Sequence, residues 1–79
     1  MSRKKVVVYC QPDCPPCYTV KEFLVARGVE FEEKDVTADS QAVRELTDQY
    51  KSRSTPTIVV GDEVMIGFDP ARLERMLAD

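Results

Sequence analysis

Two cysteines separated by two prolines, Cys14 and Cys17, are the residues of this chain best suited to chemistry. They follow an apolar segment, residues 5–9, and open a segment of helical periodicity, which places Cys14 at the N-cap of a helix. There, unpaired backbone N–H groups and the positive end of the helix dipole favour thiolate over thiol. We therefore expect the pKa of Cys14 to fall below the free-thiol value of about 8.5. The spacing predicts a thiol-disulfide centre with Cys14 as the exposed nucleophile.

The two prolines, Pro15 and Pro16, fill the first two helical positions, where a missing N–H costs no intrahelical bond. We expect them to stiffen the loop and to leave the N–H of Cys17 as the main-chain donor nearest to the Cys14 sulfur. Cys17, one turn into the helix and more buried, is expected to attack a mixed disulfide and release the reduced substrate. Lys21 adds positive potential one turn further on, and Asp13 opposes it.

Other chemistries share this cysteine spacing. A tetrahedral zinc site needs four ligands, and the chain has three cysteines and no histidine, so we predict no metal site. Cys10, Cys14 and Cys17 also have the spacing of radical S-adenosylmethionine enzymes, but those need a partial or full α/β barrel, for which 79 residues are too few. Cys10 is expected to be a buried or half-buried apolar residue, dispensable for catalysis. The alternative is a third redox or regulatory thiol.

The elements that position these cysteines follow the order βαβαββα. We expect strands at residues 5–9, 29–36, 55–60 and 63–66, and helices at residues 15–27, from 37 or 39 to about 51, and from 70 onward. The right-handed crossover rule makes the first two strands parallel neighbours, and the second strand is expected at or near an edge. The sequence predicts an α/β, thioredoxin-type fold: a four-stranded mixed sheet with three helices covering both faces, in a single domain spanning residues 1–79.

Several local signals support this arrangement. Gly61 and Asp62 form a two-residue connection that predicts an antiparallel hairpin. Three residues, Val43, Leu46 and Tyr50, are expected to form the buried stripe of the second helix. The third helix is expected to open at Asp69 and Pro70, with Phe68 packed on Leu73, and to bury Leu73, Met76 and Leu77.

Composition narrows the functional classes. A net charge of −3, with Lys and Arg scattered among acids, argues against nucleic-acid binding. The longest apolar runs, residues 6–9 and 57–60, are too short to cross a bilayer, which takes about 20 residues. Residues 1–5 are basic but lead into no cleavage site, so we expect a cytoplasmic protein. We also expect a monomer.

The dipeptide Thr55-Pro56 is the second informative site. A proline is tolerated at the start of a strand because that residue need not donate to the ladder. In a thioredoxin-type fold, however, this position holds a cis-proline beside the cysteine pair. We expect a cis bond here, which turns the N–H and C=O of Thr55 outward to pair with an extended substrate segment.

The motif Val-Tyr-x-x-x-Asp-Cys-Pro-Pro-Cys, the Thr55-Pro56-Thr57 segment and the Ile66-Gly67-Phe68-Asp69 turn together resemble the glutaredoxin family over essentially the whole chain. In that family a Lys stands where this chain has Gln11, and a small residue stands where it has Phe68. The Gly67-Phe68-x-Pro70 pattern is similar to that of NrdH redoxins. The resemblance implies that the following residues bind substrate: Tyr9, Gln11, Pro15, Pro16, Arg53, Thr55, Pro56, Gly67, Phe68 and Asp69.

The resemblance implies a dithiol oxidoreductase whose redox centre is its own disulfide, with no further cofactor. Its electron source is expected to be thioredoxin reductase or glutathione. We favour the reductase, because Gln11 replaces the family's Lys, a cation that would pair with a glutathione carboxylate. Disulfide-containing proteins such as ribonucleotide reductase are the implied substrates. Two alternatives are a carrier of a glutathione-bridged iron-sulfur cluster held by Cys14 from two chains, and a redox-inert binding module using the Pro56 loop.

Overall fold

The computed structural model describes residues 4–78 and contains the seven predicted elements in the predicted order. Of the basic start at residues 1–5, the first three lie outside the described residues. The elements are β1 (Val6–Cys10), α1 (Pro15–Ala26), β2 (Glu32–Asp35), α2 (Ser40–Arg44) with a π-helical turn η1 (Glu45–Gln49), β3 (Thr57–Val60), β4 (Glu63–Ile66) and α3 (Pro70–Leu77). Within residues 4–78, no helix is long and apolar enough to cross a membrane.

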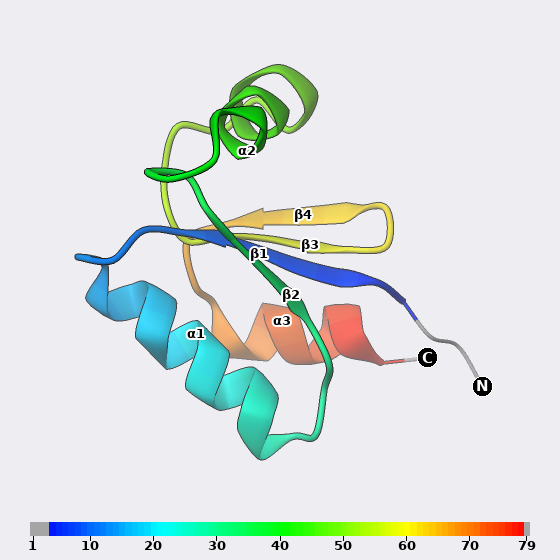
Figure 1. The fold of residues 1–79 in the computed structure, drawn as a ribbon. Coiled ribbons are helices and arrows are strands. Elements are labelled where there is room, and N and C mark those ends of the chain that lie inside the picture. Colours follow the sequence, from blue (N-terminus) through cyan, green and yellow to red (C-terminus); the bar gives the residue numbers. More distant parts are fainter. Residues whose placement is uncertain (1–3, 79) are drawn as a thin grey trace.

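The four strands form one mixed sheet in the order β2-β1-β3-β4. Strands β1 and β2 are parallel, whereas β1 with β3 and β3 with β4 are antiparallel. The sequence predictions of a parallel first pair, an edge position for β2 and an antiparallel hairpin are confirmed. In Figure 1, α1 and α3 lie on one face of the sheet and α2 lies on the other, which is the thioredoxin-type arrangement.

The central strand β1 is buried at all five positions because helices cover both faces of the sheet. Its side chains alternate between two apolar clusters. Val6, Val8 and Cys10 belong to the cluster that also contains residues of α1 and α3. Val7 and Tyr9 belong to the cluster that contains residues of α2 and η1. Successive side chains of β1 therefore point alternately to the face that carries the cysteine pair and to the opposite face.

The second helix departs from the prediction in two ways. Val43 is 38% exposed, and the buried residues are Ala42 and Leu46, which stand four apart on one helical face with Val43 turned to its solvent side. The helix also ends earlier than residue 51, because its last turn widens to a π-helix in which the N–H of Tyr50 donates to the C=O of Glu45. The predicted burial of Val43 was wrong, whereas Tyr50 does pack on the cluster.

The third helix begins as predicted. The Asp69 side chain accepts the N–H of Arg72 at 3.3 Å, and Pro70 occupies the first helical position. Phe68 packs against the cluster that contains Leu73, which is the geometry of a hydrophobic staple. These contacts hold the segment between β4 and α3 against the core.

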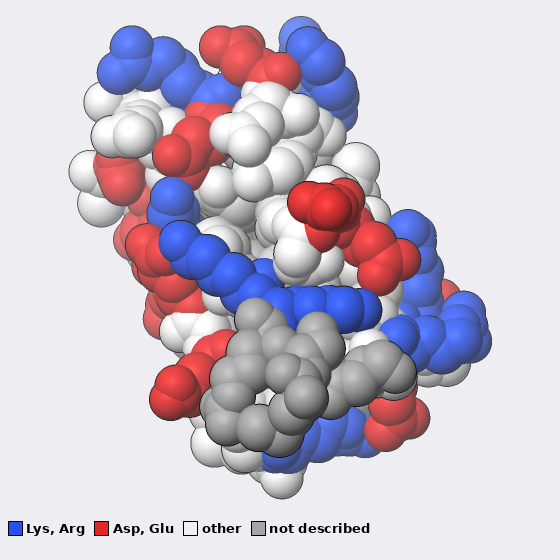
Figure 2. All heavy atoms as spheres, turned by 90° about the vertical axis from the view of Figure 1, so that its right-hand side faces the viewer, with Lys and Arg blue, Asp and Glu red and all other residues white. Residues whose placement is uncertain are grey.

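Charged side chains of both signs share the surface. Figure 2 shows Lys and Arg interspersed with Asp and Glu on the face turned to the viewer. Four ion pairs join such groups among the described residues: Lys5–Glu32, Lys21–Glu33, Arg27–Glu74 and Lys34–Glu45. The mixing follows from a sequence in which basic residues are scattered among acids.

Candidate functional site

Cys14 and Cys17 form a disulfide at the N-terminus of α1, with their Cα atoms 5.3 Å apart. Cys14 is the N-cap of the helix, in extended conformation (φ −126°, ψ 91°), and Pro15 and Pro16 fill the first two helical positions. Both cysteines are buried in this oxidised form, with Cys14 5% and Cys17 1% exposed. The difference has the predicted sign, but the exposed fraction of Cys14 is much smaller than expected.

In this oxidised form, the first helical turn directs no hydrogen bond to the Cys14 sulfur. The N–H of Cys17 donates to the C=O of Cys14 at 2.9 Å and is thus committed to the first turn rather than to the Cys14 sulfur. The Cys14 side chain makes no capping hydrogen bond to the helix. Its sulfur instead accepts from the hydroxyl of Thr55, with 3.6 Å between Oγ1 and Sγ. Sequence reasoning assigned only a backbone role to Thr55 and missed this contact.

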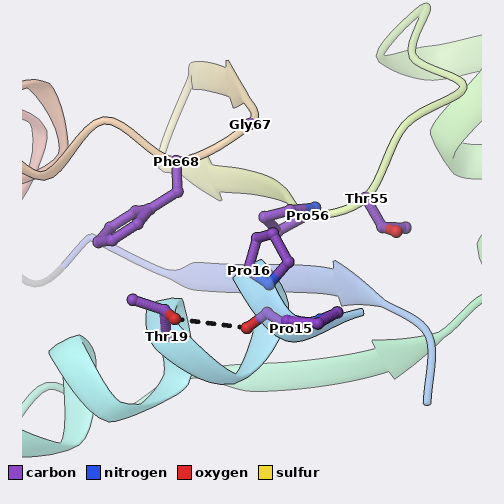
Figure 3. Close-up of a pocket in the computed structure, with 7 residues that line it drawn as sticks. All are labelled: Pro15, Pro16, Thr19, Thr55, Pro56, Gly67 and Phe68. Carbon is purple, nitrogen blue, oxygen red and sulfur yellow. Dashed lines mark hydrogen bonds between the residues drawn. The ribbon is translucent and has the colours of Figure 1, made fainter. Parts of the chain in front are cut away.

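A pocket of about 510 Å³ lies at the start of α1. It is built from three segments far apart in the sequence: α1, the loop before β3 and the turn after β4 (Figure 3). Its lining consists of apolar and hydroxyl-bearing residues together with one glycine: Pro15, Pro16, Thr19, Thr55, Pro56, Gly67 and Phe68. Six of the ten residues predicted to bind substrate therefore line one pocket.

Two backbone features join the loops of this pocket. The peptide bond between Thr55 and Pro56 is cis, as predicted. The N–H of Gly67 donates to the C=O of Pro56 at 2.8 Å, so the turn after β4 is tied to the proline loop. Gly67 has φ +85°, a conformation that favours glycine, whereas an added Cβ would meet no atom within 4 Å. The conformation of the backbone, rather than a lack of space, requires glycine at this position.

Thr19 lines the pocket but was absent from the predicted set. Its hydroxyl donates to the C=O of Pro15 at 3.3 Å, one helical turn earlier (Figure 3). The signal for it was available in the sequence, because a residue four positions after Pro15 lies on the same face of the helix.

Four predicted substrate-binding residues lie outside the pocket. Tyr9 is 2% exposed on the α2 face of the sheet, where its hydroxyl donates to Glu45 at 2.8 Å, because alternation along β1 turns it away from α1. Asp69 caps α3. Gln11 and Arg53 are exposed in loops and are not among the lining residues.

Cys10 is buried, in agreement with the sequence prediction, and its thiol is hydrogen-bonded. Sγ lies 3.2 Å from Oε2 of Glu33 and 3.7 Å from the C=O of Lys34. Burial, followed by the Glu33 carboxylate, raises the pKa of Cys10 to about 12. The ammonium of Lys21, expected to act on the cysteine pair, is ion-paired with Glu33 at 2.8 Å. Cys10 is thus held as a neutral thiol.

The described residues contain no group of three or more His, Cys, Asp or Glu side chains arranged to hold a metal.

Comparison with known proteins identifies the family. Residues 6–65 match the sequence model described as Glutaredoxin, which covers well over half of the chain. The chain belongs to the glutaredoxin family. The gene 56 protein of Mycobacterium phage L5 is 36% identical over 73 residues, which cover 91% of this chain and 71% of the phage protein. The gene 56 protein of Mycobacterium phage D29 is 33% identical over 73 residues, covering 91% of this chain and 81% of that protein.

Solved structures support the same assignment. The thioredoxin-like protein BC3987 shares 49% identity with a TM-score of 0.89, over 92% of this chain and all of the other. NrdH-redoxin from Escherichia coli, described as a glutaredoxin-like protein with a thioredoxin-like activity profile, shares 28% identity with a TM-score of 0.84, over 95% of this chain and 97% of the other. This glutaredoxin is therefore a thiol-disulfide protein with a thioredoxin-like fold, and its C-x-x-C motif forms the Cys14–Cys17 disulfide.

Proposed function

We propose that this glutaredoxin is a dithiol carrier of reducing equivalents that reduces disulfides in other proteins. The observation that carries the proposal is the Cys14–Cys17 disulfide at a helix N-terminus, with a pocket beginning at the adjacent Pro15 and Pro16. A pair that meets substrate disulfides needs a surface that receives the substrate, and the adjacent pocket offers one.

The proposed reaction has two exchange steps. The Cys14 thiolate attacks one sulfur of a substrate disulfide, which forms a mixed disulfide and releases the other substrate sulfur as a thiolate. Cys17, deprotonated, then attacks Sγ of Cys14, which forms the intramolecular disulfide and releases the second substrate thiolate. The substrate gains two electrons and the cysteine pair loses two. A reductant returns them by the same exchange in reverse.

An extended substrate segment fits the loop before β3. Within residues 4–78, neither the N–H nor the C=O of Thr55 has a hydrogen-bond partner, and Thr55 precedes the cis proline at the pocket. Main-chain pairing with such a free peptide group gives affinity without demanding particular side chains. Phe68 and the proline rings then offer apolar contacts to the segment that flanks the substrate cysteine (Figure 3).

The electron source we favour is a flavoprotein of the thioredoxin reductase type, fed by NADPH. Glutathione carries two carboxylates, and the pocket lining holds no Lys or Arg to pair with them. Arg53 is an exposed cation outside that lining, and an exposed ion pair contributes only about 0 to 1 kcal/mol. Asp69, the acid of the turn after β4, is engaged as the cap of α3. The thioredoxin-like activity profile of NrdH-redoxin, a structural neighbour, agrees with this preference.

The test offers the oxidised protein two reducing systems at equal NADPH: thioredoxin reductase, and glutathione with glutathione reductase. We expect faster reduction by thioredoxin reductase, and no turnover with Cys14→Ser in either system. Rapid reduction by glutathione with none by thioredoxin reductase would overturn the proposal that a thioredoxin reductase is the electron source. Turnover retained in Cys14→Ser would overturn the proposed function itself. A coloured protein with cluster absorbance would favour the iron-sulfur carrier instead.

The setting we propose is the cytoplasm, where thiols are kept reduced and a dithiol carrier can be recharged. Ribonucleotide reductase is a candidate protein substrate, since it forms a disulfide during turnover and needs a dithiol protein to reduce that disulfide. The NrdH-redoxin neighbour is the reason to test it first.

A further inference from the structure

The sulfur of Cys14 lacks the backbone hydrogen-bond donors that an N-cap side chain ordinarily has. An N-cap side chain ordinarily accepts from backbone N–H groups of the first helical turn. Here Pro15 and Pro16 have no N–H, and the N–H groups of Cys17 and Tyr18 donate to the Cys14 carbonyl at 2.9 and 3.4 Å. The first turn therefore directs no N–H hydrogen bond to Sγ of Cys14.

Water has little access to the same sulfur. In the disulfide form the residue Cys14 is only 5% exposed, so little water reaches it to replace the missing backbone donors. Among residues 4–78, the hydroxyl of Thr55 is the one group that donates to Sγ, at 3.6 Å, and that hydroxyl makes no other hydrogen bond. A hydroxyl has a single proton to donate, and here it is directed at the sulfur.

We infer that the Thr55 hydroxyl is a catalytic residue that donates a hydrogen bond to the Cys14 thiolate, a role that no backbone N–H of the first helical turn fills. The inference rests on the proposed role of Cys14 as the attacking thiol. A neutral disulfide sulfur is a weak acceptor, whereas a thiolate is charged, and hydrogen bonds to charged groups are roughly twice as strong. The contact thus stabilises the charged form preferentially.

The contact acts wherever Cys14 carries charge in the exchange. Before attack, it increases the fraction of Cys14 present as thiolate at neutral pH. During recharging, a thiolate of the reductant attacks Sγ of Cys14, which breaks the Cys14–Cys17 bond, releases Cys17 as a thiolate and forms a mixed disulfide. A second thiolate of the reductant then attacks the reductant's own sulfur in that mixed disulfide. The bond to Sγ breaks, its electron pair stays on Cys14, and the reductant leaves as a disulfide. The hydroxyl of Thr55 then stabilises the departing Cys14 thiolate.

The experiment measures the rate of Cys14 alkylation by iodoacetamide against pH in the reduced protein, with the labelled cysteine identified by peptide mass spectrometry. Thr55→Val removes the hydroxyl at nearly constant shape, and Thr55→Ser keeps it. Thr47→Val is the matched control, because the Thr47 hydroxyl donates to the C=O of Val43 on the helix of the opposite face. Circular dichroism establishes that each variant is folded.

We expect Thr55→Val to move the midpoint of the alkylation profile up by about one pH unit, a tenfold change in the ionisation equilibrium. Thr55→Ser and Thr47→Val are expected to stay within a few tenths of the unaltered protein. An unchanged midpoint in Thr55→Val, or equal shifts in Thr55→Val and Thr55→Ser, would overturn the inference, because the hydroxyl would then be irrelevant. If Cys17 or Cys10 reacts before Cys14 in the unaltered protein, the proposed function fails instead.

Discussion

Replacing Cys10 by serine is expected to leave disulfide reductase activity within a few-fold of that of the unaltered protein. The Cys10 thiol is buried and donates to the Glu33 carboxylate at 3.2 Å, and its pKa is raised to about 12. Since pH 7 lies five units below that value, about one Cys10 in 10⁵ is a thiolate. The thiolate is the nucleophile in exchange, so Cys10 is almost unreactive. Serine retains a donor for Glu33.

The assay compares NADPH-coupled reduction of a protein disulfide by Cys10→Ser, Cys14→Ser and the unaltered protein. A parallel alkylation time course at neutral pH, mapped by peptide mass spectrometry, is expected to show Cys10 labelled far more slowly than Cys14. Thermal unfolding checks that Cys10→Ser is folded. Loss of activity in folded Cys10→Ser as large as in Cys14→Ser, or equal labelling rates of the two cysteines, would refute this reasoning.

Two further predictions concern stability. Glu45→Gln is expected to cost about 1 kcal/mol at pH 7, because the Glu45 carboxylate accepts from the Tyr9 hydroxyl at 2.8 Å and from Lys34 at 2.7 Å. Lys34 lowers the pKa of Glu45 below its ordinary 4.5, so the contribution is present above pH 4.5 and is lost as the pH falls through the lower folded value. Urea unfolding at pH 7 and about pH 3 measures the free energy of unfolding of Glu45→Gln and of the unaltered protein. We expect the difference between the two to be smaller at the acidic pH, and an equal difference at both pH values would contradict this prediction. Asp69→Ala removes the acceptor for the N–H of Arg72 and is expected to cost about 0.5 to 2 kcal/mol in the same assay, whereas unchanged stability would show that the cap contributes nothing.

Much of the fold was predictable from the sequence because each element carries its own signal. The β-branched run of β1 indicates a strand buried on both faces, and the Gly61-Asp62 pair indicates a hairpin. Asp69 followed by Pro70 marks the start of α3. These signals depend on a few adjacent residues, and the topology rules then leave few arrangements for seven short elements.

The features that were missed depend on tertiary contacts. Ala42 and Leu46 rather than Val43 are buried, and the last turn widens to the π-helix η1; neither feature is specified by the spacing of apolar residues in this segment. Tyr9 was placed at the site by family resemblance, although strand alternation alone puts it on the face opposite Cys10. The contact between Thr55 and Cys14 spans 41 residues and becomes visible only when the loop before β3 is placed against α1.

The central claim is that Cys14 attacks substrate disulfides and Cys17 resolves the product. It is tested most directly with Cys17→Ser, which can form the mixed disulfide but cannot release it. Reduced Cys17→Ser is incubated with a protein disulfide substrate, free thiols are blocked, and the adduct is mapped by mass spectrometry. We predict a covalent adduct joined through Cys14, and none with Cys14→Ser treated in the same way. An adduct joined through Cys10, or an adduct of equal yield in Cys14→Ser, would contradict the claim.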